Sequence, residues 1–353
     1  ETTYGALTTI DAHEVSRETI IESRLESRCW SYIRQRPYSL IANPDDIPKA
    51  IFVSCFDTSP LAPDLGFIIE QERANFQKGL AVLEKLANGH LHISLHAEVG
   101  ERLSESDFSG ISNDKFHHFK GPHPAGNVGI QIHHIAPIQK GEIIWYVHPQ
   151  DVIIIGRLFT EGRYRADRVI ALTGSCVAQP QYFRVMTGQK LRSITNNRLS
   201  NSHCRLIQGN ILTGKKTTET DFLSFYENQL TAIPEGDQPE FLGWLLPGLN
   251  KLSLSRTFFS WLTPNRSYNL NTNNNGEERA FVMTGQYDKV LPMNIYPVHL
   301  LKAILAKDIE RMEELGIYEV SEEDFALCEF VCTSKIEVQR IIAEGLEYIR
   351  REG

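Results

Sequence analysis

The chain has 353 residues, which is too long for one hydrophobic core and about right for two or three domains. Its content of 41% hydrophobic and 23% charged residues is typical of a globular protein in water. The net charge of −8 argues against nucleic acid as a general partner, because phosphate binding depends on clustered Lys and Arg.

The six cysteines are scattered and include no Cys-x-x-Cys pair. They are Cys29, Cys55, Cys176, Cys204, Cys328 and Cys332. For a chain of this length the pattern indicates reduced thiols and no disulfide framework. The longest apolar runs, Ile143–Val147 and Val152–Ile155, have the length of strands and are far too short to span a membrane.

Residues 1–48 are predicted to form a connector and one helix. Ser16 is a suitable N-cap, and Ile20, Ile21 and Leu25 follow at helical spacing. The chain begins at Glu1 without Met, so we expect a fragment whose first domain is absent.

Residues 49–164 are predicted to form a Rossmann-like α/β domain. Ala50–Phe56 and His90–Leu95 are apolar runs of the kind found in buried parallel strands. The segment between them predicts a helix that ends at Gly89, with one apolar face made by Ile69, Phe76, Leu80 and Leu83. A strand, a helix and a strand in this order favour a right-handed crossover in a parallel sheet.

Residues 165–220 are predicted to form a small β-grasp-like domain with one short helix. Its β-type runs are Arg168–Leu172, Tyr182–Met186 and Cys204–Gln208.

Residues 221–353 are predicted to be mostly helical. The expected helices are one bracketed by Pro297 and Gly316, one capped by Ser321 with Asp324 three residues on, and one over Ile336–Arg351. The predicted fold class is therefore α/β, with a Rossmann-like domain, a β-grasp domain and a helical C-terminal part.

Two glycine spacings approach a P-loop but do not meet its requirements. Gly209-x4-Gly214 is followed by Lys215 and Lys216, where a P-loop needs Lys and then Ser or Thr to bind Mg²⁺. A β-hairpin edge explains this segment better. Gly121-x4-Gly126 is followed by Asn-Val, so it fails the same test. A G-x-G-x-x-G dinucleotide turn does not follow the first predicted strand.

Metal ligation is also weakly supported. Nine of the twelve histidines lie between 90 and 148, and His90 and His92 are spaced to share a strand face, but a defined set of three or four ligands is missing. Cys328-x3-Cys332 has helical spacing, yet an iron–sulfur cluster needs four thiolates. We therefore predict no metal bound by this chain and no catalytic residue of its own.

Two segments are candidates for ligand contact. CWSYIRQRPYSL interleaves aromatic and cationic side chains, which suits either a planar carbonyl ligand or a helix end with arginines at its rim. FKGPHPAGNVGIQIHHI, residues 119–135, predicts a kinked loop that prolines stiffen and that Gly121 and Gly126 allow to turn.

Several blocks of sequence resemble one known family. KGPHPAGNVGIQIHHI, VHPQDVIIIGRLFTEG, RVIALTGSCVAQPQYFRVMTGQKL, EFLGWLLPGLNKLSLSRTFF, NTNNNGEERAFVMTGQYDKVLPM and LALCEFVCTSK occur in matching order. They resemble the A subunit of the Na⁺-translocating NADH:quinone oxidoreductases of bacterial membranes, from about Trp30 to the C-terminus. That family is similar to the flavin-carrying subunit of respiratory complex I and to the C subunit of the Rnf complex. Compared with those relatives, this chain lacks the glycine-rich flavin loop and keeps only Cys328 and Cys332 of the cluster cysteines.

The resemblance implies a cofactor-free subunit, peripheral to the cytoplasmic face of the bacterial inner membrane, that contributes to ubiquinone binding and to assembly of the complex. The flavins and the iron–sulfur centre would belong to partner subunits. The expected partners are the other subunits of the complex, especially the adjoining membrane subunit, together with quinone, and nucleic acid is not expected. The alternatives are an independent flavin or NADH enzyme and a purely structural docking subunit. Our candidate quinone contacts are Trp30, Tyr32, Arg34, Arg36, Tyr38, Lys120, His123 and Gly126.

Overall fold

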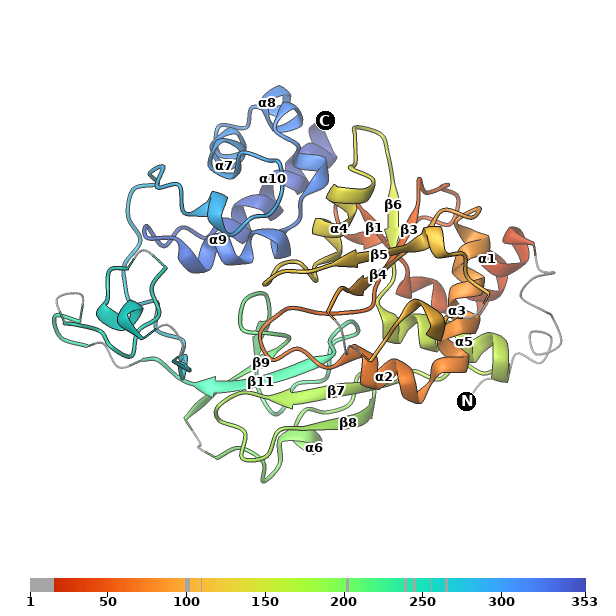
Figure 1. The fold of residues 1–353 in the computed structure, drawn as a ribbon, viewed down its shortest axis with the longest axis horizontal. Coiled ribbons are helices and arrows are strands. Elements are labelled where there is room, and N and C mark those ends of the chain that lie inside the picture. The colour runs from red at the N-terminus through yellow and green to blue at the C-terminus, as the bar shows by residue number, and fades with distance from the viewer. Residues whose placement is uncertain are drawn as a thin grey trace.

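The computed structural model describes residues 16–98, 102–108, 110–200, 203–237, 240–243, 246–254, 256–263 and 266–353. Residues 1–15 of the predicted connector lie outside these ranges. The described chain forms two β-sheets and a C-terminal group of helices, and the helices lie beside the first sheet (Figure 1). The predicted α/β fold with a helical C-terminal part is confirmed.

The first sheet is mainly parallel. In spatial order its strands are β2 (Leu40–Ile41), β1 (Arg34–Arg36), β6 (Ile144–Tyr146), β3 (Ile51–Ser54), β4 (Leu91–His96) and β5 (Phe116–Phe119). β6, β3, β4 and β5 run parallel, whereas β1 pairs antiparallel with β6 and with β2. The parallel strands are apolar on both sides because helices cover both faces of the sheet.

Each face of this sheet belongs to a different hydrophobic core. Successive side chains of a strand point to opposite faces, so Ile51 and Val53 enter one core and Phe52 enters the other. The core around Ile51 is closed by α1 (Arg17–Glu26), α2 (Leu65–Gln71), α3 (Arg73–Leu86) and α5 (Pro149–Glu161). The core around Phe52 is closed by α4 (Val128–Ile135) and the C-terminal helices.

The helix predicted after Ser16 is confirmed as α1, whose Thr19 amide donates to the Ser16 hydroxyl at 3.3 Å. The helix predicted between the first two strands is divided into α2 and α3 at Glu72. Val152–Ile155, an apolar run with the length of a strand, is part of α5, which begins after His148 and ends at Gly162. The prediction of a loop over 119–135 was wrong for its C-terminal half, which is α4.

The second sheet combines parallel and antiparallel pairs. In spatial order its strands are β10 (Lys215–Thr217), β9 (Cys204–Gln208), β11 (Gln229–Pro234), β7 (Asp167–Thr173) and β8 (Gln181–Met186). The helix predicted here is the single turn α6 (Arg192–Thr195). The turn at 209–214 joins the antiparallel strands β9 and β10, as the hairpin interpretation predicted. β11 was not predicted, and it completes the sheet between β9 and β7.

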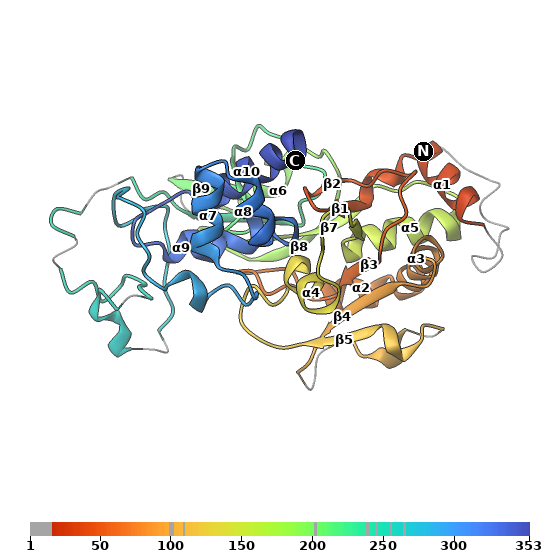
Figure 2. The ribbon, with the colours of Figure 1, turned by 90° about the horizontal axis from the view of Figure 1, so that it is seen from above.

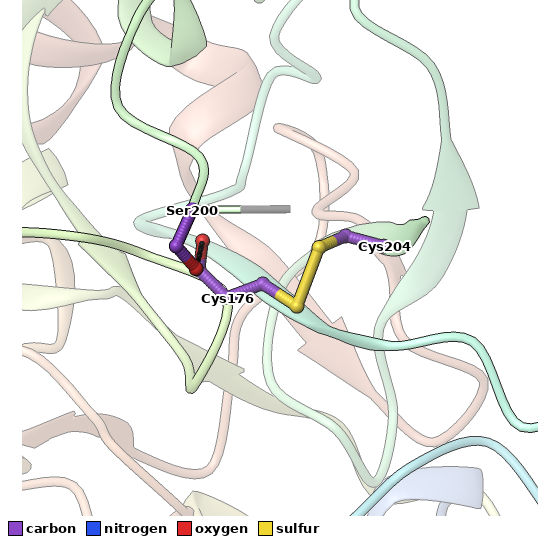
Figure 3. The surroundings of a disulfide bond; sticks show 3 residues. All are labelled: Cys176, Ser200 and Cys204. Atoms are coloured by element: carbon purple, nitrogen blue, oxygen red, sulfur yellow. Dashed lines mark hydrogen bonds between the residues drawn. A yellow bond between two sulfur atoms is a disulfide. The ribbon is translucent and has the colours of Figure 1, made fainter. Parts of the chain in front are cut away.

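A disulfide bond joins Cys176 and Cys204, which are 28 residues apart (Figure 3). The prediction that all six cysteines are reduced is therefore wrong for this pair. The other four cysteines are free and buried. Next to the bond, the Ser200 amide and hydroxyl both donate to the carbonyl oxygen of Cys176, at 2.8 and 3.0 Å. These contacts attach the end of β7 to the segment before β9.

The C-terminal part contains the helices α7 (Pro297–Leu305), α8 (Ile309–Glu314), α9 (Ala326–Val331) and α10 (Val338–Glu352). Short 3-10 helices complete the described structure: η1 (Cys29–Tyr32), η2 (Glu105–Asp107), η3 (Asn113–Lys115), η4 (Phe259–Leu262), η5 (Tyr287–Lys289), η6 (Ile317–Glu319) and η7 (Glu322–Phe325). The helix expected between Pro297 and Gly316 is two helices, α7 and α8. Ser321 and Asp324 form the expected capping box at η7. Within the described ranges, no helix combines the length and the apolar character that crossing a bilayer requires.

Candidate functional site

The first sheet has one topological switch point, between β3 and β6. From β3 the chain adds β4 and β5 on one side, and it then returns to add β6 on the other side. Open α/β sheets bind ligands outside the carboxyl ends of strands at such a point. Here those ends are Ser54 and Tyr146.

The loop before α4 covers the end of β3. The Ser54 hydroxyl donates to the carbonyl oxygen of Gly126 at 3.2 Å, and the Gly126 amide donates to the Thr58 hydroxyl at 2.8 Å. A Cβ at position 126 would lie 2.6 Å from the Thr58 amide nitrogen, so only glycine fits without a shift. The loop therefore occupies the place at β3 where a ligand would lie in an open fold of this kind.

His123 is held in the same loop. Its Nδ1 lies 3.2 Å from the Thr58 hydroxyl oxygen, and its Nε2 is buried without a hydrogen-bond partner among the described residues. Burial lowers the pKa of His123, although Asp57 and Asp324 oppose this effect, so the ring is neutral at pH 7. A water molecule or a ligand atom is needed to satisfy Nε2.

Asp324 connects this loop to β1. Arg36 donates from Nη1 to Asp324 Oδ2 at 3.2 Å and from Nη2 to Glu323 Oε1 at 2.6 Å. On the other side of the carboxylate, Asn127 donates from Nδ2 to Asp324 Oδ1 at 3.4 Å. A Cβ at Gly129 would lie 2.4 Å from Asp324 Oδ2, so the start of α4 packs directly against this carboxylate.

Arg34 lies where the two sheets meet. Its guanidinium carbon is 5.4 Å from the ring centroid of Tyr146 and 4.9 Å from that of Tyr226. Tyr146 ends β6 in the first sheet, and Tyr226 precedes β11 in the second. The hydroxyl of Tyr226 donates to the carbonyl oxygen of Ser31 at 2.8 Å, which holds the ring in place. The result is a half-buried cation between two aromatic faces.

Trp30 and Tyr32 belong to the core behind this site. The Trp30 indole donates to the carbonyl oxygen of Ala42 at 2.6 Å, and the ring packs edge-on against Trp145. The Tyr32 hydroxyl lies 2.9 Å from that of Tyr164, and its ring stacks on Phe225. Both side chains are almost fully buried, so they support Arg34 from behind and do not face solvent.

The remaining candidates lie at the edges. Tyr38 is half-buried against the C-terminal core, and burial raises the pKa of its hydroxyl. Lys120 is exposed, with its ammonium 3.7 Å from a carboxylate oxygen of Glu98. The structure thus brings Arg34 and Arg36 together, links Arg36 to the His123 loop through Asp324, and leaves Lys120 apart.

Sequence reasoning missed Tyr146 and Tyr226, and it recognised Asp324 only as a helix cap. Tyr146 follows a strand-like run, IIWY, and a side chain at the end of a buried strand is a candidate for a ligand site. Tyr226 and Asp324 carry no comparable signal, because each becomes adjacent only when distant segments meet.

Metal ligation has little support among the described residues, where no group of three His, Cys, Asp or Glu side chains gathers as a metal site. His92 Nδ1 lies 2.8 Å from His117 Nε2, and burial together with His117 lowers the pKa of His92 to about 4. Cys332 accepts a hydrogen bond from the Tyr287 hydroxyl at 2.9 Å, and burial raises the pKa of Cys328 to about 12.

Comparison with known families gives two matches. Residues 15–164 match the family described as the NqrA second alpha/beta domain, and residues 169–219 match the NQRA C-terminal domain. A crystal structure of NAD⁺-reducing [NiFe]-hydrogenase in the H2-reduced state is similar, with a TM-score of 0.50 and 10% identity. That match covers 99% of this chain and 63% of the hydrogenase chain, and at this identity it reflects the fold alone.

Curated relatives extend over nearly the whole chain. The A subunit of the Na(+)-translocating NADH-quinone reductase of Hahella chejuensis is 40% identical, over 96% of this chain and 75% of the relative. The same subunit of Rhodopirellula baltica is 37% identical, over 100% of this chain and 76% of the relative.

The fold and these relatives define the class of the chain: it is an α/β subunit of an oxidoreductase complex. The chain belongs to the family of the A subunit of the Na(+)-translocating NADH-quinone reductase. The resemblance stated from the sequence blocks is therefore confirmed.

Proposed function

We propose that this chain contributes to quinone binding in the sodium-translocating NADH-quinone reductase, at a surface centred on Arg34. The observation that carries the proposal is the position of Arg34 between the rings of Tyr146 and Tyr226. A quinone is a planar ring with two carbonyl acceptors, so it suits a cationic donor beside partly exposed aromatic rings, as Tyr146 and Tyr226 are.

The hydrogen bonds of Arg34 leave it donors for a ligand. Arg34 donates one hydrogen bond from Nη2 to the carbonyl oxygen of Ser39, at 2.9 Å. The guanidinium has five N–H donors in a fixed plane, so the others remain available to a quinone carbonyl. Arg36 differs, because its carboxylate partners hold it in the interior, where it positions β1 and does not contact ligand.

His123 offers a second contact. Its neutral ring has an unsatisfied Nε2, and the loop that holds it is tied to Arg36 through Asn127 and Asp324. Under the proposal, Arg34, Tyr38 and His123 border the ligand, Gly126 sets the path of the loop, and Trp30 and Tyr32 support the site from the core. Lys120 is exposed and is assigned to the rim.

One observation favours the alternative of a structural docking subunit. The loop around Gly126 fills the end of β3 at the switch point, where a cofactor-binding relative would need space. In that case the two sheets would serve to hold partner subunits, and the quinone would bind elsewhere.

The proposal also covers the location of the chain and its partner subunits. We infer that the chain is peripheral and lies at the cytoplasmic face of the bacterial inner membrane, next to the membrane subunits of the complex. Ubiquinone is the substrate of the whole complex in this proposal, and partner subunits carry the flavins and the iron–sulfur centre.

Titration of the chain with a short-chain ubiquinone tests the proposal. Saturable binding should weaken about tenfold in Arg34→Gln, because a charged hydrogen bond is lost. Arg198→Gln is a matched control, since Arg198 also lies over a ring, that of Phe183 at 4.8 Å, but in the second sheet. This control should bind normally.

Photolabelling of the assembled complex with an azidoquinone gives the second measurement. Labels on peptides that contain Tyr146 or Tyr226 would support the proposal. Labels confined to other subunits, together with equal quinone binding by Arg34→Gln and the unsubstituted chain, would favour the docking alternative.

A further inference from the structure

Exposed apolar side chains are concentrated in one part of the molecule. Of the twenty-two large hydrophobic residues that are exposed in the described chain, nine lie between 241 and 262. They are Phe241, Leu242, Leu246, Leu249, Leu252, Leu254, Phe259, Trp261 and Leu262. Phe241 is 89% exposed. We call residues 241–276 the apolar lobe. A patch of this kind marks an interaction surface, because single exposed apolar residues are normally scattered.

The apolar lobe differs in charge from the rest of the chain. Residues 241–276 contain Lys251, Arg256 and Arg266 and no Asp or Glu, whereas the whole chain has a net charge of −8. Lys251 pairs with Glu240, just outside the lobe. Arg256 and Arg266 have no carboxylate partner within the described ranges. The surface is therefore apolar and locally cationic.

Cations and aromatic rings are interleaved in the lobe. Lys251 Nζ lies 5.2 Å from the ring centroid of Phe258, and the Arg256 guanidinium lies 5.8 Å from that of Trp261. Long cationic side chains beside aromatic rings are typical of the level of lipid headgroups, because Lys, Arg and Trp each have an apolar body and a polar end.

The lobe holds its exposed residues outward by local packing. Buried and exposed side chains alternate around the start of η4, since Phe258 and Ser260 are buried while Phe259 and Trp261 are exposed. The Ser260 hydroxyl donates to the carbonyl oxygen of Lys251 at 2.5 Å, and Arg266 donates to that of Leu249 at 3.1 Å. The exposed rings are thus part of a defined local fold.

Most of the described lobe extends away from both sheets (Figure 1), and Thr272 contacts Glu235 and Gly236 just after β11. In Figures 1 and 2 the described residues of the lobe form the teal segment between β11 and the C-terminal helices, at one end of the long axis. A flat surface can therefore reach the lobe without meeting the sheets.

We propose that the apolar lobe binds the surface of a bilayer that contains anionic lipids, with Phe259, Trp261 and the neighbouring leucines at headgroup depth. The cations are complementary to anionic headgroups, each contributing to attraction near the surface. The irregular backbone of the lobe keeps it at the level of the headgroups, because backbone amides without hydrogen bonds are not tolerated in the hydrocarbon core of a bilayer. This inference goes beyond quinone binding and does not depend on it.

Co-sedimentation of the chain with lipid vesicles tests the inference. We expect binding to vesicles of equal parts phosphatidylcholine and phosphatidylglycerol, and much weaker binding to phosphatidylcholine alone. Phe259→Ser combined with Trp261→Ser should reduce partitioning about tenfold or more. The control replaces two exposed apolar residues elsewhere, Ile47→Ser with Leu61→Ser, and should bind normally.

A second variant changes the charge of the lobe and leaves its exposed apolar side chains in place, so it tests the inference even if the first variant disturbs the fold of the lobe. Arg256→Glu should weaken binding to the anionic vesicles about fivefold or more. Lys307→Glu is its matched control, because Lys307 lies over the ring of Tyr348 at 5.7 Å, outside the lobe. Failure of the unsubstituted chain to sediment with anionic vesicles would overturn the inference. Normal vesicle binding by both lobe variants would overturn it as well. If those variants instead lost association with a membrane subunit of the complex, the partner of the lobe would be a protein and not the bilayer.

Discussion

Arg36 and Asp324 are 288 positions apart in the chain and form an ion pair 3.2 Å long in the interior. Burial alone would lower the pKa of Arg36, but Asp324 and Glu323 together raise it. The guanidinium is therefore charged at any physiological pH, and it depends on these two carboxylates. The pair joins β1 of the first sheet to η7 of the C-terminal part, and Asn127 extends the contact to the loop that carries His123.

We expect Asp324→Ala to lower the free energy of unfolding by about 3 kcal/mol, because it leaves a buried arginine with only one carboxylate partner. The substitution also removes the acceptor of the Ser321 amide at the start of η7. Chemical denaturation measures the change. As a control, Glu142→Ala breaks the exposed pair with Lys49 and should cost less than about 1 kcal/mol. Equal costs in the two variants would contradict the structural role of Asp324.

Gly126→Ala should destabilise the chain by about 1 to 3 kcal/mol, because the new methyl group would overlap the backbone at Thr58. Thermal unfolding and the chemical shifts of the His123 ring would report the displaced loop. Gly276→Ala is the control, since the nearest neighbour of its added Cβ would be the flexible side chain of Lys335, at 3.2 Å, and the nearest backbone atom would be 4.0 Å away. A Gly126→Ala protein with unchanged unfolding would mean that the loop has room at β3.

Reduction of the Cys176–Cys204 disulfide should lower the unfolding free energy of the second sheet by about 3 kcal/mol, because a closed loop of this length restricts the unfolded chain. Thermal unfolding with and without a reductant measures the difference. The Cys176→Ser, Cys204→Ser double variant is the control and should show no response to reductant. A similar response in both proteins would assign the effect to other thiols.

Stability should decrease as the pH falls below about 6.5. Burial, with a contribution from Arg168, lowers the pKa of His148 to about 3 in the folded chain, while an unfolded histidine titrates near 6.5. Between these values the unfolded state binds a proton that the folded state does not, so folding is favoured above pH 6.5 and progressively less below it. Glu72 and Asp167, whose pKa values are lowered by neighbouring arginines, act in the same direction at lower pH. Asp151 acts in the opposite direction, because burial raises its pKa to about 6.

The His148→Asn variant isolates the contribution of His148 to the pH dependence of stability. His148 caps α5 by accepting a hydrogen bond from the Gln150 amide at 3.2 Å, and asparagine can still cap the helix. Denaturation at several pH values between 4.5 and 7, roughly the window set by these pKa values, should give a slope that is shallower by about one proton. An unchanged slope would show that His148 is protonated in the folded chain.

Local patterns in the sequence predicted much of the first sheet. Apolar runs such as Ile51–Ser54 and the Ser16 cap of α1 depend on neighbouring residues alone, so they can be recognised before the fold is known. Val152–Ile155 could not be assigned to a strand or a helix from its length, because a run of four apolar residues fits a strand or a fully buried helix equally well. The helix signals were outside the run, in Pro149 at its first turn and Gly162 at its end.

The candidate site was only partly accessible to sequence reasoning. CWSYIRQRPYSL contains the two arginines of the candidate site, but the segment alone does not show which of its side chains lie in the core. Trp30 and Tyr32 were therefore predicted as quinone contacts together with Arg34, and the structure places both in the core. The two rings that enclose Arg34 come from positions 146 and 226, and their approach follows from how the sheets pack. The Cys176–Cys204 bond was missed for the same reason, since spacing alone does not show which thiols meet.

The alternation of Ile51, Phe52 and Val53 has a consequence for how the protein can be divided. One short strand supplies side chains to two cores, so the two cores share the first sheet. A shortened protein that ends before α7 would leave Phe52, Ile130 and Ile144 without the cover of the C-terminal helices, and only α4 would remain over that side of the sheet. The C-terminal helices and the first sheet should therefore unfold in a single cooperative step, although they lie at opposite ends of the sequence.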